Sequence, residues 1–273
     1  MEKMQVVKRR GRTEELNLEK VHAMVEEACE GLSGVSASQV EINSNLQFYD
    51  GIKTEQIQDI LVRSASDLID LENPNYQFVA ARLLSVSIRK KLFGRERKHP
   101  HIKTHLWKGA EKGIYDQELW SSYNDVEWDR INNYIDYDRD DQFTYAGLRQ
   151  VADKYLVQDR STGEIYESPQ QMYILIAASI FSVYPLETRL KYVKDYYDAI
   201  SKHQINLPTP IMAGVRTPIR QYASCVLVDI DDTLDSIFSS DMAIGKYVAQ
   251  RAGIGINAGR IRGINSKIRG GEV

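Results

Sequence analysis

The sequence lacks the features that mark secreted, membrane-spanning and zinc-ribbon proteins. Its only two cysteines, Cys29 and Cys225, form no C-x-x-C pair, which excludes a local zinc ribbon and a disulfide framework. No apolar segment of the secretory type opens the chain, and the longest apolar run, residues 173–183, is too short for a membrane span. The formal net charge of -3 argues against a general nucleic-acid coat or a polybasic membrane binder. A reducing, cytoplasmic setting is therefore expected.

The N-terminal part of the chain has the pattern of a small, mainly helical domain. Residues 5–16 predict a hairpin, with apolar ends around a glycine turn. Apolar residues then recur at helical spacing, with Asn17 as the expected N-cap of the first helix and Thr54 as the cap of a later one. Gly94 follows the last helical segment, as expected at a helix end. We therefore predict one compact domain over residues 1–94.

The middle of the chain, residues 95–220, is predicted to be mostly helical. A second hairpin is expected near residues 154–168, and the apolar run at 173–183 favours a buried helix. Residues 205–218 contain too much proline for a helix and are expected to form an ordered loop.

The last part, residues 221–273, predicts a strand–helix–strand unit. The continuous apolar run at 224–230 is typical of a buried strand, and a helix from about 233 to 250 would follow, ending at Gly253. The next segment can return as a second strand, which is how an α/β domain begins.

Several residues of types that carry chemistry lie in this last part. Cys225, at the mouth of the expected strand, either faces a ligand pocket or is a small buried hydrophobe. Asp232 either caps the following helix or accepts a ribose hydroxyl beside a phosphate site. Arg260, Arg262 and Arg269 alternate with glycines, as suits a triphosphate or a solvated basic loop.

Three stretches together carry a resemblance to a known family: LPTPIMAGVRTP at 207–218, SCVLVDIDDTLDSI at 224–237, and YVAQRAGIGINAGRIRG at 247–263. They resemble the N-terminal part of the large (alpha) subunit of class Ia ribonucleoside-diphosphate reductase, and the resemblance covers essentially the whole chain. The opening VKRRGRTEELNLEKV is similar to the family's regulatory ATP-cone.

The resemblance implies an α/β protein with a helical N-terminal part, divided into three regions. They are an ATP-cone over residues 1–94, a helical region over 95–220, and, over 221–273, the first strands of an incomplete ten-stranded α/β barrel with part of the specificity site.

The family reduces ribonucleoside diphosphates to deoxyribonucleoside diphosphates, for DNA synthesis, by radical chemistry. A thiyl radical abstracts a substrate hydrogen, and a separate cysteine pair, re-reduced by thioredoxin or glutaredoxin, supplies two electrons. By resemblance, Cys225 is one thiol of that reducing pair. The positions implied to bind substrate are Thr209, Ser224, Ala252 and Gly253.

Two effector sites for ATP and deoxynucleoside triphosphates are also implied. The specificity site would use Asp232, Arg262, Ile268 and Arg269. The ATP-cone would use Lys8, Arg9, Glu14, Asn17, Lys20, Thr54 and Lys90; without the resemblance, the basic members would read as a solvated surface. Gln58 stands where cones of this family often have histidine, which keeps nucleotide binding expected but puts inhibition by dATP in question.

The family's radical cysteine and second reducing cysteine lie beyond Val273. We therefore expect an N-terminal fragment of a split or truncated, phage-like large subunit, inactive without a C-terminal fragment and the radical-generating, di-iron beta subunit. The resemblance further implies alpha–alpha dimerisation partly through the helix at 233–250, no metal in this chain, and a host-cytoplasmic location if it is phage-encoded. No membrane partner and no direct nucleic-acid partner is expected. The alternative is a non-catalytic, nucleotide-sensing regulatory or docking module, in which Cys225 would be dispensable.

Overall fold

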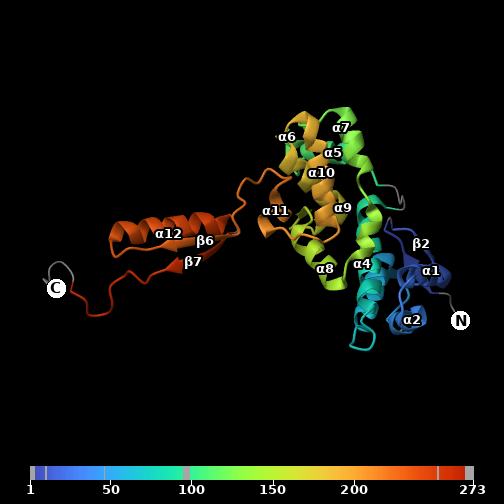
Figure 1. Ribbon diagram of the computed structural model, residues 1–273. Helices are drawn as coiled ribbons and strands as arrows, with labels where there is room; N and C mark the ends of the chain where they lie inside the picture. Colours follow the sequence, from blue (N-terminus) through green and yellow to red (C-terminus); the bar gives the residue numbers. More distant parts are fainter. Residues whose placement is uncertain (1–3, 10, 46, 95–98, 251, 268–273) are drawn as a thin grey trace. The chain divides into compact units, whose positions relative to one another are not determined.

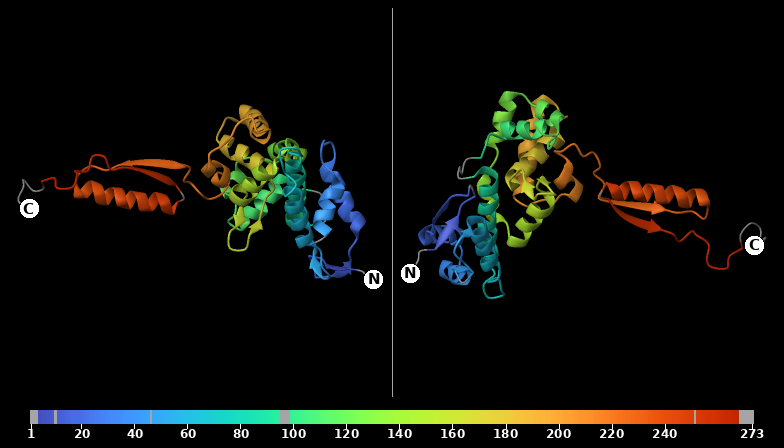
Figure 2. Two further views of the ribbon diagram at one scale, coloured as in Figure 1. Left: turned by 90° about the horizontal axis from the view of Figure 1, so that it is seen from below. Right: turned by 180° about the vertical axis from the view of Figure 1, so that it is seen from behind.

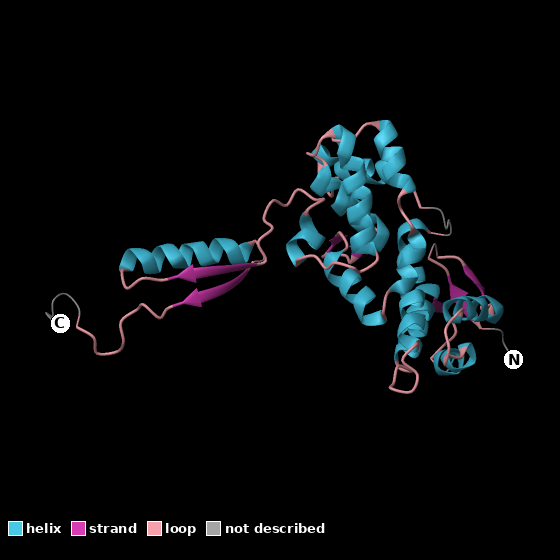
Figure 3. Cartoon of the chain, in the orientation of Figure 1, coloured by secondary structure: helices cyan, strands magenta, loops and turns pink. Residues whose placement is uncertain are grey.

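The computed structural model describes residues 4–9, 11–45, 47–94, 99–250 and 252–267. The chain divides into two compact units, which we describe separately. The first contains residues 1–206 and 216–218, and the second contains residues 207–215 and 219–273. Helices make up most of the first unit, whereas the second contains a strand–helix–strand element (Figure 3). Among the described residues, no helix is both long and apolar enough to cross a membrane.

The first unit opens with a three-stranded sheet in the order β2-β1-β3 (Figure 1). Strand β1 (Gln5–Val7) pairs antiparallel with β2 (Thr13–Glu15), which confirms the predicted hairpin. Strand β3 (Ile52–Lys53) pairs parallel to β1 and was not predicted, because two residues are too few to show an alternating pattern.

Four helices complete this N-terminal region: α1 (Leu18–Cys29), α2 (Ala37–Asn45), α3 (Thr54–Ser66) and α4 (Tyr76–Phe93). Val25, Leu61 and Leu83, from three of them, are fully buried and form the core. Leu18 has the helical spacing of the buried residues of α1 but is 55% exposed, and it is the first residue of that helix.

The capping predictions have mixed outcomes. Asn17 caps α1 as predicted, since its Oδ1 accepts a hydrogen bond from the backbone N–H of Lys20 at 2.9 Å. The prediction that Thr54 caps α3 is wrong. Lys53 occupies the N-cap position, and its N–H is satisfied by the side chain of Gln56. Gly94 ends α4 with φ of 66°, a conformation that glycine adopts without strain.

The rest of the first unit is a helical assembly with one small hairpin. Strands β4 (Gln158–Asp159) and β5 (Glu164–Ile165) pair antiparallel, as predicted. The apolar run predicted to be a buried helix is α9 (Pro169–Phe181), in which residues 172–178 are all buried. The remaining elements are α5 (Ile102–Glu111), α6 (Gln117–Ser121), α7 (Asp125–Asn133), η1 (Tyr137–Gln142), α8 (Tyr145–Gln150), η2 (Val151–Tyr155) and α10 (Leu186–Ser201).

The second unit contains α11 (Thr209–Gly214), β6 (Cys225–Asp229), α12 (Leu234–Ala249) and β7 (Gly253–Asn257). The predicted loop at 205–218 is wrong in part. Thr209 and Pro210 begin a short helix, because proline is tolerated in a first helical turn, where its missing N–H has no partner to lose.

Strands β6 and β7 pair in parallel, and α12 lies along them in both views of Figure 2. The strand–helix–strand prediction is confirmed, with Thr233 as the N-cap of α12. The expected full burial of β6 is wrong, because its residues alternate between exposed and half-buried. Gly253 does not end the helix but begins β7, and Gln250 is the C-cap.

Candidate functional site

The predicted thiol lies at the amino end of β6. Cys225 is exposed, so the expectation that a lone cysteine is a small buried hydrophobe does not hold here. Cys225 and the exposed Leu227 and Asp229 alternate with half-buried Val226 and Val228. Because α12 packs on the sheet, this alternation places the thiol on the face turned away from α12.

Four of the predicted substrate-side residues are brought together by strand pairing. Cys225 is the direct register partner of Gly253, and the N–H of Gly253 donates to the carbonyl oxygen of Ser224 at 2.9 Å. Ala252 is buried immediately before β7, and its N–H donates to the carbonyl oxygen of Tyr247 on α12. The starts of β6 and β7 therefore bring Cys225 and the three predicted substrate-binding residues next to one another.

Thr209, the fifth predicted substrate-side residue, is the exposed first residue of α11. No hydrogen bond joins it to the other four among the described residues of the second unit. Its role at a substrate site stays a prediction.

The predicted specificity residues lie past the carboxyl ends of the same strands. The Nε of Arg262 donates to Oδ2 of Asp232 at 2.6 Å, so these two predicted residues meet, although 30 positions separate them. Asp232 is not the helix cap; Thr233 is. Ile268 and Arg269 lie outside the described residues.

A second arginine joins this cluster. The guanidinium of Arg260 contacts Asp231 at 3.0 Å and Asp229 at 3.5 Å, and the attraction of these carboxylates raises the pKa of Arg260. The Nδ2 of Asn257 donates to Asp229 at 2.8 Å, which ties the ends of β6 and β7 together. The alternation of arginine and glycine marks this segment in the sequence, but it does not show which carboxylate each arginine contacts.

The predicted cone residues lie around β1, β2 and the starts of α1 and α3. The Nζ of Lys8 contacts Glu14 at 2.7 Å, and this hydrogen bond, helped by the charge of Lys20, lowers the pKa of Glu14. Arg9 pairs with Glu55, in the first turn of α3 beside Thr54, at 2.9 Å. Lys8 and Arg9 are thus each held by a carboxylate, and Glu55 is a partner that sequence reasoning missed.

Lys90 reaches this region from the last turn of α4. Its Nζ donates to Oε1 of Gln58 at 3.2 Å and contacts Sδ of Met24 at 3.3 Å. Gln58 is buried on α3, and its Nε2 donates to the carbonyl oxygen of Leu83 on α4 at 3.0 Å. Met24 and Gln58 each follow a predicted effector residue, Lys20 or Thr54, by one helical turn. Cationic groups from the hairpin, from α1 and from α4, with polar side chains of α3, therefore surround one region, an arrangement suited to phosphate oxygens.

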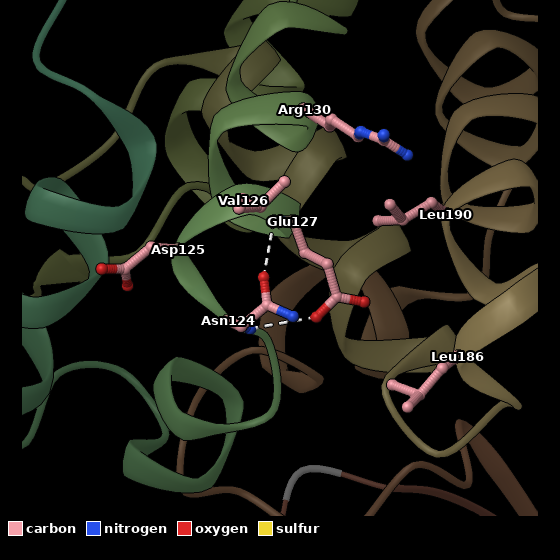
Figure 4. A pocket seen from close by; sticks show the side chains of 7 residues that line it. All are labelled: Asn124, Asp125, Val126, Glu127, Arg130, Leu186 and Leu190. Carbon is pink, nitrogen blue, oxygen red and sulfur yellow. Dashed lines mark hydrogen bonds between the residues drawn. The ribbon is translucent and has the colours of Figure 1, made fainter.

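An open surface pocket lies elsewhere in the first unit. It has a volume of about 680 Å³ between α7 and the start of α10 and is lined by Asn124, Asp125, Val126, Glu127, Arg130, Leu186 and Leu190 (Figure 4). Asn124 and Glu127 form reciprocal hydrogen bonds at the start of α7. None of the predicted site residues lines this pocket. No cluster of three His, Cys, Asp or Glu side chains able to hold a metal occurs within the described part of the chain.

Comparisons with known protein families agree with this division of the chain. The ATP cone domain matches residues 4–91, the ribonucleotide reductase all-alpha domain matches residues 141–220, and the ribonucleotide reductase barrel domain matches residues 223–273. The chain thus combines a nucleotide-binding regulatory domain with the first part of a reductase barrel, which defines the class as ribonucleotide reductases.

Individual relatives narrow the assignment. The chain is 54% identical over 98% of its length to ribonucleoside-diphosphate reductase 1 subunit alpha of Escherichia coli, and 53% identical over 98% to the subunit alpha of Haemophilus influenzae. It is 40% identical over its full length to the subunit alpha of Enterobacteria phage T4. The chain spans about a third of the length of these relatives, 35%, 35% and 36% respectively. It belongs to the ribonucleoside-diphosphate reductase alpha-subunit family and is homologous to the N-terminal portion of that subunit.

Proposed function

We propose that this chain is the regulatory and substrate-facing N-terminal part of a reductase that converts ribonucleoside diphosphates to deoxyribonucleoside diphosphates. One observation carries the proposal above the others. Cys225 is an exposed thiol at the amino end of β6, on the sheet face away from α12, directly opposite a residue without a side chain. A thiol that reacts with a sugar must be reachable in this way.

The chemistry assigned to Cys225 is a two-electron transfer. The ribose 2′-hydroxyl leaves as water, and a C–H bond replaces the C–O bond. Two thiols lose their hydrogens and become one disulfide, so that electrons and protons balance. Cys225 supplies one thiol, and the other comes from a part of the enzyme outside this sequence. Thioredoxin or glutaredoxin restores the dithiol.

Turnover by this route requires more than the described residues. Leu227 on β6 is 83% exposed, and the sheet has only two strands among the described residues. A sheet of two strands leaves backbone groups unpaired at its edges, and further strands pair with such edges. We infer that the remaining barrel strands, carried in this polypeptide or in another, and a radical-generating beta subunit are needed for activity. Exposed apolar residues on α12, among them Phe238 and Met242, suit alpha–alpha dimerisation.

Regulation is assigned to the two cationic clusters. The cone cluster binds ATP or dATP, and the pair formed by Asp232 and Arg262 contributes to a deoxynucleoside triphosphate site, with the carboxylate on ribose and the guanidinium on phosphate.

The test compares Cys225→Ser with Cys29→Ser in the assembled reductase. Cys29 is the only other cysteine and is half-buried on α1, so its substitution controls for loss of a thiol as such. We expect Cys225→Ser to abolish deoxynucleotide formation while nucleotide binding to the cone is retained, and Cys29→Ser to keep turnover. Turnover by Cys225→Ser at the wild-type rate would instead favour a nucleotide-sensing docking module without catalysis.

A further inference from the structure

One face of the β6–β7 pair has a single position, at Gly253, that no side chain of the described residues covers. Side chains alternate along a strand, so register partners lie on the same face. The face turned away from α12 therefore carries three pairs: Cys225 with Gly253, Leu227 with Gly255, and Asp229 with Asn257. Strand β7 contributes no side chain to the first two of these pairs.

The two glycines differ in the space above them. A Cβ atom added to Gly253 would meet only the carbonyl oxygen of Ser224, at 3.4 Å, which is an ordinary contact. A Cβ atom added to Gly255 would lie 2.7 Å from Cδ2 of Leu227. The side chain of Leu227 therefore lies across Gly255, while the space over Gly253, beside the thiol, is left empty by the described residues.

Polar side chains lie on the same face at the carboxyl ends of β6 and β7. Asp229 accepts a hydrogen bond from Asn257 and pairs with Arg260. With a rise of about 3.3 Å per residue, this cluster lies about 13 Å along β6 from Cys225. Leu227 stands between the two ends and separates a thiol from a charged cluster.

We propose that Leu227 is a positioning residue that forms the apolar wall of the sugar-binding space over Gly253. The ring of a ribonucleotide's ribose lies over Gly253, meets the Cys225 thiol on one side, and is stopped by Leu227 from sliding toward Asp229. Glycine at 255 is what allows Leu227 to lie across the strand. The inference rests on the proposed function, because it takes Cys225 as the substrate-facing thiol.

The test is a double-substitution cycle in the assembled reductase. Gly255→Ala forces Cδ2 of Leu227 to move, and only the end of a flexible side chain has to yield, so the fold is retained. We expect the KM for the ribonucleoside diphosphate to rise about tenfold, the size of effect that one misplaced methyl group has in an apolar pocket, with a smaller change in kcat. Leu227→Val removes both δ-methyl groups and with them the clash. When Leu227→Val is already present, Gly255→Ala should therefore raise KM much less than it does in the wild-type background.

Leu227→Ala is a second test, because this substitution only removes atoms and so creates no clash. It should also raise KM, by loss of the wall, while thermal unfolding followed by circular dichroism stays close to wild type. Leu71→Val and Leu71→Ala are the matched controls, because Leu71 is a fully exposed leucine in the first unit.

The proposal is overturned if Gly255→Ala and Leu227→Ala both keep KM within about twofold of wild type. It is also overturned if the effects of Gly255→Ala and Leu227→Val on KM are additive in the double variant. That result is distinct from failure of the proposed function, which would show as turnover by Cys225→Ser whatever residue stands at 227.

Discussion

The ammonium nitrogen of Lys90 lies 3.2 Å from the side-chain oxygen of Gln58, and the amide nitrogen of the same glutamine donates to the carbonyl oxygen of Leu83. One buried amide on α3 is thus bonded twice to α4 and holds a predicted effector-binding lysine in place. Glutamine makes both bonds without a proton equilibrium near neutral pH, so the position of the ammonium does not depend on pH through this residue.

Substitutions at Gln58 should change the affinity of the cone for nucleotide. Gln58→Met keeps the length of the side chain but loses both hydrogen bonds, and we expect the Kd for ATP to rise roughly two- to tenfold, the worth of one hydrogen bond. Gln58→Glu places a carboxylate against Lys90 that competes with phosphate, so it should weaken binding further. Isothermal titration calorimetry on the chain measures both, with the exposed Gln47→Met as control. Unchanged affinity in Gln58→Glu would show that Lys90 does not contact the nucleotide.

The pair formed by Arg262 and Asp232 gives a prediction about the second effector site. Arg262→Gln removes a charge-assisted contact, and we expect deoxynucleoside triphosphate binding to the assembled reductase to weaken about ten- to a hundredfold. The loss of affinity caused by Arg262→Gln should become smaller as salt concentration rises, because salt screens the attraction between the wild-type arginine and the nucleotide. Equilibrium binding at two salt concentrations measures this, with the exposed Arg160→Gln as control. Equal losses in both variants would argue against a specific role for Arg262.

The sequence was sufficient to predict β6, α12 and β7 of the second unit, but not the burial of β6. The apolar run of β6 is a local signal, and the strand that it predicts is confirmed. Burial depends instead on what covers a strand, and among the described residues α12 covers one face only. The short helix α11 escaped prediction because prolines ordinarily end helices, whereas Pro210 lies in a first turn, where it is harmless.

The resemblance was sufficient to place Asp232 and Arg262 in one site, but not every partner of a site residue could be predicted. Arg9 and Glu55 are far apart in sequence, and no local pattern links them. The buried pair of Glu167 and Arg216 is a further case, because an arginine in a proline-containing segment gives no sign that it will be fully enclosed.

Removing one partner of this Glu167–Arg216 pair should strongly destabilise the first unit. Both side chains are 0% exposed, and Arg216 also donates to the carbonyl oxygen of Tyr155 at 2.9 Å. Arg216→Met leaves an uncompensated buried carboxylate, which costs about 3–5 kcal/mol of unfolding free energy. Urea denaturation measures this cost. Lys191→Met, which breaks an exposed pair with Asp195, should cost less than about 0.5 kcal/mol. Similar costs for the two variants would contradict the burial argument.

His105 should make a contribution to the stability of the chain that is lost in mild acid. Burial lowers the pKa of His105 from 6.5 to about 4, and its Nε2 lies 3.0 Å from the hydroxyl of the buried Tyr115. Between these two pKa values, the unfolded chain binds a proton that the folded chain excludes. The contribution of His105 to the unfolding free energy should therefore drop as pH falls from about 6.5 toward 4, and it should stay constant below about pH 4.

Two substitutions separate this effect from general acid unfolding. His105→Gln removes the titrating group, and the slope of unfolding free energy against pH should become shallower in that window. His22 is the opposing control, because hydrogen bonding to Glu41 raises its pKa, so its contribution is present in acid and is lost as pH rises. His22→Gln should leave the acid loss in place or steepen it. Urea unfolding midpoints at pH 7.5, 6 and 5 compare the three proteins, and equal slopes would refute the assignment to His105.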